Sequence, residues 1–378
     1  MRESVMANRE SRQKKSVLAD LLDRCSEPAA SALTSSGPGA AVRCLACAHR
    51  CLIRPGRRGV CRVRFNEQGV LRAPWGYAAG LQIDPIEKKP FYHALPGGRA
   101  LSFGMLGCNL HCAFCQNWFS SQTLRDDASA AMPTVCDPAA IVAEGVRQGA
   151  DAVISTYNEP LITADWAHAV FSEAKRHGLP CGFVSNGYAT PEVLAYLRPV
   201  TDLFKVDLKC FDDESYRGLG CRLAPVLDCI QRLVDLGYWV EVVTLLIPGF
   251  NDDGAELRGM ARFLAGVSPH LPWHVTAFHP QYKMANKRST TPEDLFRAWQ
   301  IGRDAGLHHV YAGNLPGRVG TLEDTLCPGC GTILVERTGF QIRRNRIQNG
   351  VCPDCGTLVA GYWTRHSAAN TSLKMFRP

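Results

Sequence analysis

The sequence lacks any long apolar run. None of its 378 residues belong to a stretch of ~20 consecutive apolar residues that could cross a membrane. The opening MRESVMANRESRQKK mixes charges of both signs and has no apolar core of the kind found in signal peptides. We therefore expect no membrane association, and we expect a cytoplasmic protein.

A concentrated basic patch is also missing. The net charge is +7 and the isoelectric point is about 8.6, but lysine and arginine are scattered along the chain. Aromatic and basic residues adjoin in one place, YWTRH at 362–366, which is a weak version of the pattern that binds nucleic acid. Nucleic acid is therefore not an expected partner.

Cysteine, in contrast, is abundant. There are 17 cysteines, and eleven of them fall in three tight groups, as metal ligands do. In a reducing cytosol such grouped thiols indicate metal or cluster ligands, since disulfides do not persist there. The remaining six are expected to be small buried hydrophobic residues: Cys25, Cys136, Cys181, Cys210, Cys221 and Cys229.

The central group is Cys108, Cys112 and Cys115, with the spacing C-x3-C-x2-C and the aromatic Phe114 before the last cysteine. Three thiolates in one loop can hold three corners of a cubane iron–sulfur cluster and leave the fourth iron open to a small molecule. The alternative is a structural zinc loop. Zinc sites usually take four protein ligands, and the next cysteine, Cys136, follows only after a long gap.

Around this loop, short apolar runs alternate with segments of helical period, which predicts an α/β fold with a parallel sheet or barrel. The strand-like runs are 100–106, 153–157, 181–185, 203–208, 239–247, 273–278 and 309–311. The helical segments are 139–148, 162–177, 192–197, 227–236, 255–264 and 292–305. About six β–α units are too few for a closed eight-stranded barrel, so a partial barrel is expected.

Polar residues stand where the predicted strands end, which is where barrels of this type place their chemistry. They are Asn158, Glu159, Ser185, Asn186, Asp207, Lys209 and His279. A bound zwitterion needs acceptors for its ammonium and donors for its carboxylate, and an acid, a second acid and a lysine would supply both. The alternative is that strand ends are polar because they meet solvent.

The cysteine loop, aromatic residue included, resembles the signature of the radical S-adenosylmethionine (radical SAM) enzymes. The resemblance implies a partial (β/α)6 barrel, a [4Fe-4S] cluster on Cys108, Cys112 and Cys115, and S-adenosylmethionine (SAM) chelated at the open iron. It also implies reductive cleavage of SAM to a 5′-deoxyadenosyl radical, with electrons from a flavodoxin- or ferredoxin-type donor. Phe114 belongs to the signature.

The strand-end residues extend the resemblance to the glycyl-radical-activating enzymes. YNEP at 157–160 is similar to their Gly-Gly-Glu-Pro element, which binds the SAM amino group, although both glycines are replaced. DLK at 207–209 is similar to their Asp-x-Lys element, and His279 matches a histidine of their sixth strand. SNG at 185–187 resembles their Thr-Asn-Gly element, but Val184 replaces an aspartate associated with a monovalent cation.

Two further cysteine groups flank the predicted barrel. CPGCG at 327–331 and CPDCG at 352–356 form two knuckles whose four thiolates, Cys327, Cys330, Cys352 and Cys355, suit tetrahedral zinc. With ribbon strands at 332–336 and 340–343 they predict a zinc-ribbon-like module; a redox site or second cluster is the alternative. Cys44, Cys47, Cys51 and Cys61 suit either an auxiliary iron–sulfur cluster or a second zinc, with His49 as an alternative ligand.

These features divide the chain into four parts. We expect a flexible extension over 1–40, a cysteine-rich segment with a lid over 41–97, the barrel over 98–318 and the ribbon-like module over 319–378. The lid is the charged run DPIEKKPFYH at 84–93, in which Lys88, Lys89 or His93 would face substrate. A packed loop over the barrel mouth is the alternative.

The order of cysteine segment, barrel and ribbon resembles one narrower family, the radical SAM enzyme of the AmmeMemoRadiSam system. The run at 84–93, CQNW at 115–118 and VYAGN at 310–314 carry this match. It implies Memo-type and AMMECR1-type partner proteins and hydrogen abstraction from an unidentified substrate, by analogy a protein or peptide. Alternatives are a glycyl-radical-enzyme activase and a non-catalytic iron- or zinc-binding sensor or RNA-binding module.

Overall fold

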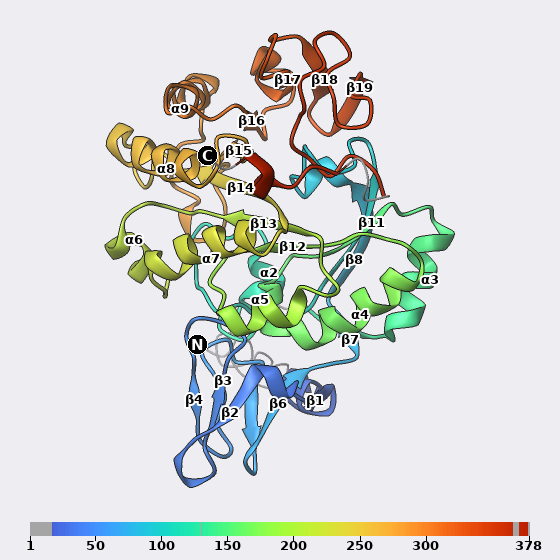
Figure 1. Ribbon diagram of the computed structural model, residues 1–378. Coiled ribbons are helices and arrows are strands. Elements are labelled where there is room, and N and C mark those ends of the chain that lie inside the picture. The colour runs from blue at the N-terminus through green and yellow to red at the C-terminus, as the bar shows by residue number, and fades with distance from the viewer. Residues whose placement is uncertain (1–16, 130, 366–369, 377–378) are drawn as a thin grey trace.

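The computed structural model describes residues 17–129, 131–365 and 370–376. Three parts follow one another along the chain and in space (Figure 1). Short blue strands from the N-terminal part lie at one end of the molecule, the barrel forms the middle, and the strands β17, β18 and β19 lie at the other end. The cysteine groups at the two ends of the sequence thus lie on opposite sides of the barrel.

Within the described residues the central sheet has eight strands in the order β16-β15-β14-β13-β12-β11-β9-β8. Neighbours from β9 to β16 are parallel, whereas β8 is antiparallel to β9. The strands are β8 Gly80–Pro85, β9 Arg99–Gly104, β11 Ala152–Ser155, β12 Cys181–Ser185, β13 Leu203–Asp207, β14 Trp239–Leu246, β15 Trp273–Ala277 and β16 Val310–Gly313. The predicted α/β class with a parallel sheet is confirmed, and β8 is an addition that the sequence did not indicate.

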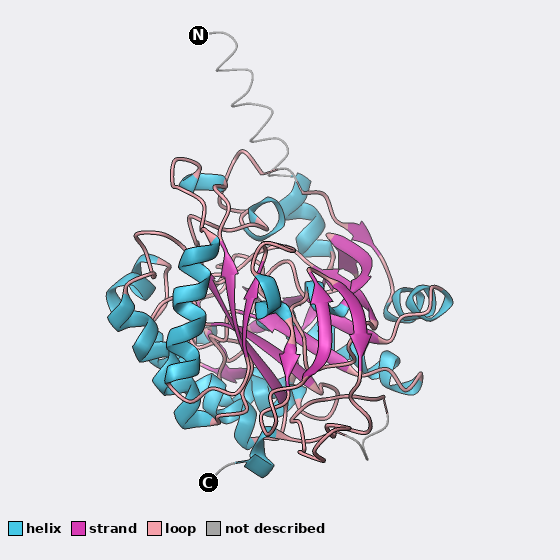
Figure 2. Ribbon diagram, turned by 90° about the horizontal axis from the view of Figure 1, so that it is seen from above, coloured by secondary structure: helices cyan, strands magenta, loops and turns pink. Residues whose placement is uncertain are grey.

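Helices connect these strands and lie outside them, as the view from above shows (Figure 2). The longer ones are α3 Pro138–Arg147, α4 Ala164–Arg176, α5 Pro191–Leu197, α7 Leu223–Asp235, α8 Gly254–Val267 and α9 Pro292–Asp304. Several begin at an N-cap whose side-chain oxygen accepts a first-turn N–H; at Thr291 a full capping box forms with Asp294. The short α2 (Trp118–Ser121) and α6 (Asp213–Gly218) lie outside the predicted segments.

The core lies between the parallel strands and these helices. The strands are buried along most of their length, as expected when both faces of a parallel sheet are covered. Trp166 and Trp273 are the largest fully buried hydrophobic side chains, and Phe103, Phe183 and Phe204 are fully buried with them. This packing holds the carboxyl ends of the strands in fixed positions, where the polar residues are found.

The N-terminal part is more ordered than the sequence suggested. Helical conformation at 17–24 is followed by two three-stranded antiparallel sheets. Their strands are β1 Ser26–Pro28, β5 Phe65–Glu67, β6 Val70–Pro74, β2 Thr34–Ser36, β3 Val42–Cys44 and β4 Leu52–Ile53. The helix agrees with a short amphipathic piece expected around 17–22. The prediction of a flexible extension over 1–40 is wrong from residue 26 onward, because backbone pairing with later strands orders that segment. Residues 1–16 lie outside the described residues.

The C-terminal module is a three-stranded antiparallel sheet of β17 Thr325–Leu326, β18 Ile333–Thr338 and β19 Gln341–Asn345, close to the predicted ribbon strands. It has a small core of its own around Leu334, Val335 and Val359. Buried Arg337 ties it to the barrel, donating to the carbonyl oxygen of Tyr92 at 2.8 Å. Among the described helices, none is both long and apolar enough to cross a lipid bilayer.

Candidate active site at the mouth of the barrel

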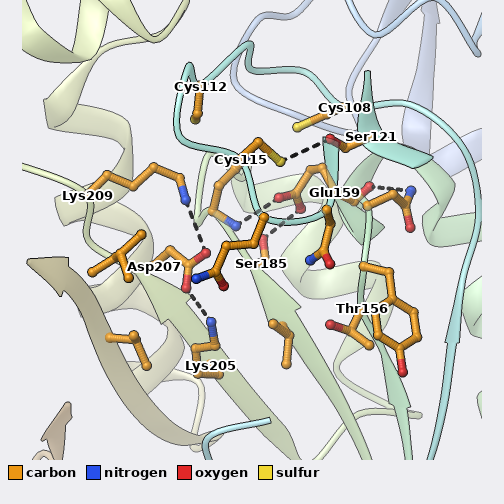
Figure 3. A pocket seen from close by; sticks show the side chains of 18 of the residues that line it. Cys108, Cys112, Cys115, Ser121, Thr156, Glu159, Ser185, Lys205, Asp207 and Lys209 are labelled. Carbon is orange, nitrogen blue, oxygen red and sulfur yellow. Dashed lines mark hydrogen bonds and ion pairs between the residues drawn. The ribbon is translucent and has the colours of Figure 1, made fainter. Parts of the chain in front are cut away.

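A cavity of about 410 Å³ opens at the carboxyl ends of the parallel strands (Figure 3). The loop that holds Cys108, Cys112 and Cys115 forms one wall. Residues at and just beyond the carboxyl ends of β11, β12 and β13 form the opposite side, and they include most of the polar strand-end residues. Residues from nine separate stretches of the chain therefore converge on one space.

The cysteine loop runs from the end of β9 to α2. The backbone N–H of Leu110 points at the Cys108 sulfur, 3.4 Å away, and Cys115 Sγ lies 3.2 Å from the hydroxyl oxygen of Ser121. Burial raises the pKa of the Cys112 thiol to about 11 even though Lys209 opposes the shift. These thiols are therefore protonated unless a metal displaces the proton, which is the usual behaviour of thiolate ligands.

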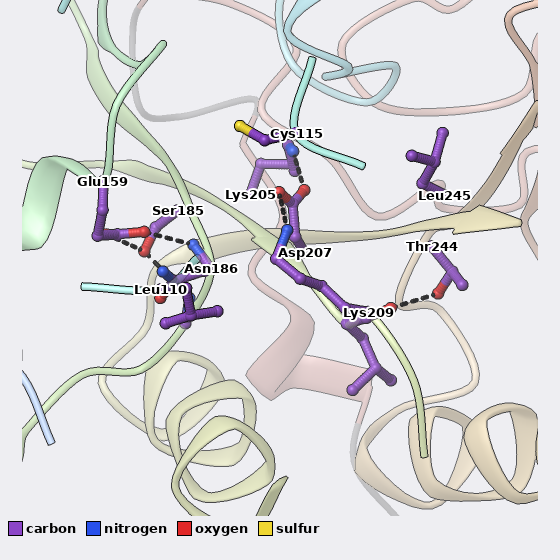
Figure 4. Close-up of polar contacts among 12 residues, drawn as sticks. Leu110, Cys115, Glu159, Ser185, Asn186, Lys205, Asp207, Lys209, Thr244 and Leu245 are labelled. Atoms are coloured by element: carbon purple, nitrogen blue, oxygen red, sulfur yellow. Dashed lines mark hydrogen bonds and ion pairs between the residues drawn. The ribbon is translucent and has the colours of Figure 1, made fainter. Parts of the chain in front are cut away.

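Glu159 is the most fully satisfied carboxylate at the cavity (Figure 4). It accepts hydrogen bonds from Ser185 Oγ at 2.7 Å, from the Asn186 N–H at 2.8 Å and from the Leu161 N–H at 3.0 Å. Burial raises its pKa to about 7, although these hydrogen bonds lower it. A buried carboxylate with this pKa is poised to accept a cationic ligand, because a positive charge would favour its ionised form.

Asp207 lies between two ammonium groups (Figure 4). Lys209 Nζ is 3.1 Å from one carboxylate oxygen, and Lys205 forms an ion pair with the other. Burial opposes ionisation of Asp207, but the two lysines outweigh it and lower its pKa to about 2. The group carries a net positive charge and can donate to the carboxylate of a ligand.

The segment that carries Asn158 and Glu159 has an unusual backbone. Tyr157 has a φ of 72°, in the left-handed region that a tyrosine rarely adopts. The similar Gly-Gly-Glu-Pro element has glycine at this position, so the chain keeps a glycine-like backbone with a bulky residue, at a cost of about 1–3 kcal/mol. Asn158 Oδ1 accepts from the Met105 N–H at 3.0 Å and so joins this segment to the cysteine loop.

The other predicted contacts are also near the cavity, with one exception. Asn186 Nδ2 donates to Asn109 Oδ1 at 2.8 Å, and Phe114 is buried with Lys209 Nζ 5.9 Å from the centre of its ring. His279, however, does not line the cavity; it is exposed, and its Nε2 lies 3.3 Å from the carbonyl oxygen of Asn314. The structure therefore does not place His279 with the other predicted SAM contacts.

The predicted lid is divided between two environments. Lys88 and Lys89 line the cavity, but His93 is fully buried elsewhere and bonds Ala360 O at 2.7 Å and the Tyr311 hydroxyl at 2.5 Å. Phe340, at the tip of the β18–β19 hairpin, also reaches the cavity. The expectation that His93 faces substrate is wrong, because its hydrogen bonds hold the ribbon module against the barrel.

Two residues that line the cavity, Lys205 and Phe340, could not be identified as site residues from the pattern of strand ends. Lys205 lies inside β13, two residues before Asp207, and the signal that could have revealed it is a charged residue on the same face of an otherwise apolar strand. Phe340 comes from a separate module more than a hundred residues later, and no sequence signal links it to the cavity.

The four ribbon thiols are already gathered. Cys327 Sγ lies 3.6 Å from Cys355 Sγ, and Cys330 Sγ lies 3.7 Å from Cys352 Sγ. All four ligand atoms lie within 4.8 Å of one another. A tetrahedral ion with sulfur ligands at ~2.3 Å would require sulfur separations of roughly 3.8 Å, so the group fits a metal of that kind.

Comparisons with known proteins identify the class. Residues 104–264 match the model of the radical SAM superfamily. The chain is 36% identical over 304 residues, covering 80% of this chain and 89% of the relative, to "Uncharacterized protein MJ0808" of Methanocaldococcus jannaschii. It is 25% identical over 199 residues, 49% of this chain, to pyruvate formate-lyase-activating enzymes of Staphylococcus aureus, of which it covers 78%.

Two solved structures align with parts of this chain. A domain of a pyruvate-formate lyase-activating enzyme from Bacteroides vulgatus aligns with 43% of this chain and 99% of its own length, at 20% identity and a TM-score of 0.39. A radical SAM methyltransferase from Sphaerobacter thermophilus aligns with 63% of this chain and 71% of its own length, at 17% identity and a TM-score of 0.46.

The cysteine loop at the barrel mouth and the family match agree, and the chain belongs to the radical SAM superfamily, whose members are enzymes that catalyse radical chemistry. Within it, the chain shares most of its length with the M. jannaschii protein. The radical SAM domain implies a [4Fe-4S] cluster and SAM. The three cavity thiols and the acid and lysine groups opposite them suit this pair of cofactors.

Proposed function

We propose that this enzyme reductively cleaves SAM and abstracts a hydrogen atom from a protein or peptide substrate. The observation that carries the proposal is the convergence of Cys108, Cys112 and Cys115 with Glu159 and the Asp207 group on one cavity. When bound, the [4Fe-4S] cluster and SAM supply the one-electron chemistry that yields a 5′-deoxyadenosyl radical.

The chain's own residues would bind the two cofactors and orient them in the cavity. The three cysteines would hold three irons and leave the fourth open toward the cavity. Glu159 would accept the ammonium of SAM, while Lys209 and Lys205 would donate to its carboxylate. Asn158 and Asn186, together with Ser185 and Phe114, would fix the wall against which the ligand lies. A radical carries no charge that a protein can steer, so position and exclusion of water must control it.

The test is 5′-deoxyadenosine formation by anaerobically reconstituted enzyme with dithionite and SAM. We expect product from the wild type and none from Cys108→Ala, Cys112→Ala or Cys115→Ala. Cys136→Ala is the matched control, because this half-buried thiol lies outside the three groups, and it should retain activity. Absence of product from a wild type that holds about four irons in the loop would refute the proposal.

Three further assignments accompany this function. Radical SAM enzymes need a reductant, and we propose a flavodoxin- or ferredoxin-type donor in the cytoplasm, where clusters and grouped thiols remain reduced. We propose zinc for the ribbon thiols, which are spaced for a tetrahedral ion. We also propose the AmmeMemoRadiSam family, with Memo-type and AMMECR1-type partners; co-purification of either protein with the tagged enzyme tests this.

A glycyl-radical-enzyme activase is the second candidate function. It is favoured by the 25% identity to enzymes named pyruvate formate-lyase-activating enzymes. An EPR doublet on a glycyl-radical protein incubated with this enzyme, SAM and reductant would establish it. The membership in an enzyme family leaves the non-catalytic sensor and the RNA-binding module without support.

A further inference from the structure

The N-terminal cysteine group lies directly against the cysteine loop of the cavity. Cys44, Cys47 and Cys61 are buried and Cys51 is half-buried. The backbone N–H of Val60 donates to Cys51 Sγ at 3.5 Å, which closes the long gap before Cys61. A Cβ built on Gly107, the residue before Cys108, would lie 3.2 Å from the carbonyl oxygen of Cys61. The two groups are thus separated by little more than backbone.

Asn109 connects the two groups. It follows Cys108 directly, is fully buried, and its side-chain amide faces Cys47. In the described structure the amide nitrogen has no partner of good hydrogen-bond geometry, whereas its carbonyl oxygen accepts from Asn186. A buried donor without a partner costs about 1–3 kcal/mol. A metal-bound Cys47 thiolate would be the acceptor that this amide lacks.

Two further side chains join the groups. His49 Nε2 lies 3.0 Å from the carbonyl oxygen of Asn109. Arg125 donates from one nitrogen to the carbonyl oxygen of Cys108 at 2.7 Å and from the other to that of Val60 at 2.6 Å. Its guanidinium therefore places a positive charge between two sets of thiolates. The Nε2 atom of His49 is engaged by the cavity loop, which leaves the four cysteines as the candidate ligands of the N-terminal site.

The spacing of the thiols distinguishes this site from the ribbon. Among the residues that the structure describes, the ribbon thiols are the group whose ligand atoms all lie within 4.8 Å of one another. The thiols of Cys44, Cys47, Cys51 and Cys61 are not gathered in this way, nor are those of the cavity loop. The corners of a [4Fe-4S] cube place thiolate sulfurs roughly 6–7 Å apart, about twice the separation around zinc.

We propose that Cys44, Cys47, Cys51 and Cys61 hold an auxiliary [4Fe-4S] cluster that passes electrons through Asn109 to the cluster at the cavity. One electron from a low-potential one-electron donor converts the auxiliary cluster from 2+ to 1+. The same electron then reduces the cavity cluster from 2+ to 1+ and returns the auxiliary cluster to 2+; no proton moves. The relay rests on the proposed function, whereas the presence of the auxiliary cluster does not.

The first experiment leaves the N-terminal site intact. The Cys108→Ala/Cys112→Ala/Cys115→Ala variant is purified anaerobically beside the wild type, and iron, sulfide and zinc are measured with the EPR spectrum after dithionite. We expect about eight irons in the wild type and about four in the variant, with an EPR signal in the variant that SAM does not change. A variant with no iron and about two zinc ions would overturn the proposal.

The second experiment tests the relay. Asn109→Asp keeps the shape of the side chain but replaces the amide that faces Cys47 with an acid. We expect the iron content to stay unchanged and the midpoint potential of the auxiliary cluster to fall. Freeze-quench EPR should show slower reduction of the cluster whose signal responds to SAM. Asn345→Asp, on the exposed ribbon strand β19, is the matched control and should match the wild type. An unchanged potential and rate in Asn109→Asp would overturn the relay.

A failure of the proposed function would look different. If the triple variant retained about four irons but the wild type showed no SAM-sensitive signal and no 5′-deoxyadenosine, radical SAM cleavage would be refuted. The auxiliary cluster would still be supported, because its iron does not depend on the cavity loop. The metal analysis and the product assay therefore separate the two proposals.

Discussion

The two flanking cysteine groups have four thiols each, but the protein around them differs. At the N-terminal group three thiols are buried, and Arg64 and Asp165 form an ion pair nearby whose side chains are 1% and 5% exposed. At the ribbon, Cys330 and Cys355 are exposed, and the neighbouring Arg346–Asp354 pair is 26% and 39% exposed. Equal ligand counts therefore occur in very different electrostatic environments.

This difference indicates different roles. A buried site pressed against the cavity loop can exchange electrons with it and must have its charges compensated by nearby groups. A site at the solvent-exposed end can stabilise a small module that has few core residues of its own. Three changes test this contrast and a fourth tests the cavity, beginning with the largest expected effect.

Removing the ribbon metal should have the largest local effect. Cys330→Ser/Cys355→Ser should release about one zinc ion and unfold the module, because structural zinc supplies apparent binding energies of ~10–16 kcal/mol in small domains. The barrel iron should remain. Metal analysis and limited proteolysis of residues 325–363 measure both effects; a protected module without zinc would contradict a structural role.

Breaking the buried ion pair beside the N-terminal group should destabilise the whole protein. Arg64→Ala leaves Asp165 buried, and we expect a loss of about 3–5 kcal/mol in the free energy of unfolding. Denaturant unfolding under anaerobic conditions measures it. Arg64→Ala/Asp165→Ala is the control and should recover part of the loss, because the unpaired charge is gone; no recovery would show that packing dominates.

The buried carboxylate at the cavity should make SAM binding depend on pH. Glu159 has a pKa of about 7, so it becomes ionised as pH rises through 7, and SAM affinity should increase about tenfold between pH 6 and 8. Folded-state stability moves the other way: because the folded pKa is raised above the ordinary value, the contribution of Glu159 falls between about pH 4.5 and 7. Calorimetric titration measures the affinity for SAM at each pH. In Glu159→Gln this affinity should no longer depend on pH. A pH-independent affinity in the wild type would contradict the role of Glu159 in binding the ammonium of SAM.

The smallest effect is expected at the exposed pair of the ribbon. Arg346→Ala removes the partner of Asp354, but surface ion pairs contribute little because water screens both charges. Thermal unfolding and zinc content should match the wild type. A clear decrease in either would mean that the ribbon depends on this pair and would weaken the contrast with Arg64.

The sequence predicted the repeating part of the fold well. The strand over 181–185 agrees with β12 residue for residue, and the other parallel strands agree to within a few residues at each end, because an apolar run between turn signals reports burial on both faces. The paired strands over 26–53 were not predicted, because each is three residues or fewer and is stabilised by distant partners. The antiparallel β8 is half-exposed and carries no such run.

The site was predictable where chemistry is concentrated in short motifs. The three cysteines of the loop lie at one cavity with the residues at the carboxyl ends of β11, β12 and β13, because parallel strands bring these ends to one edge. His279, two residues beyond the end of β15, did not join them; it is exposed, and its Nε2 lies 3.3 Å from the carbonyl oxygen of Asn314. Lys205 and Phe340 were not identified, the first hidden within a strand and the second in another module.

The sequence by itself determined which thiols form groups, where the parallel strands lie and which polar residues end them, because ligand spacing and burial leave local patterns. Tertiary structure alone decided which groups meet. Asn109 joins two cysteine groups that are more than forty residues apart, and Arg337 fastens the ribbon to the barrel. Contacts of this kind depend on how packed elements orient distant side chains, and no local pattern encodes that orientation.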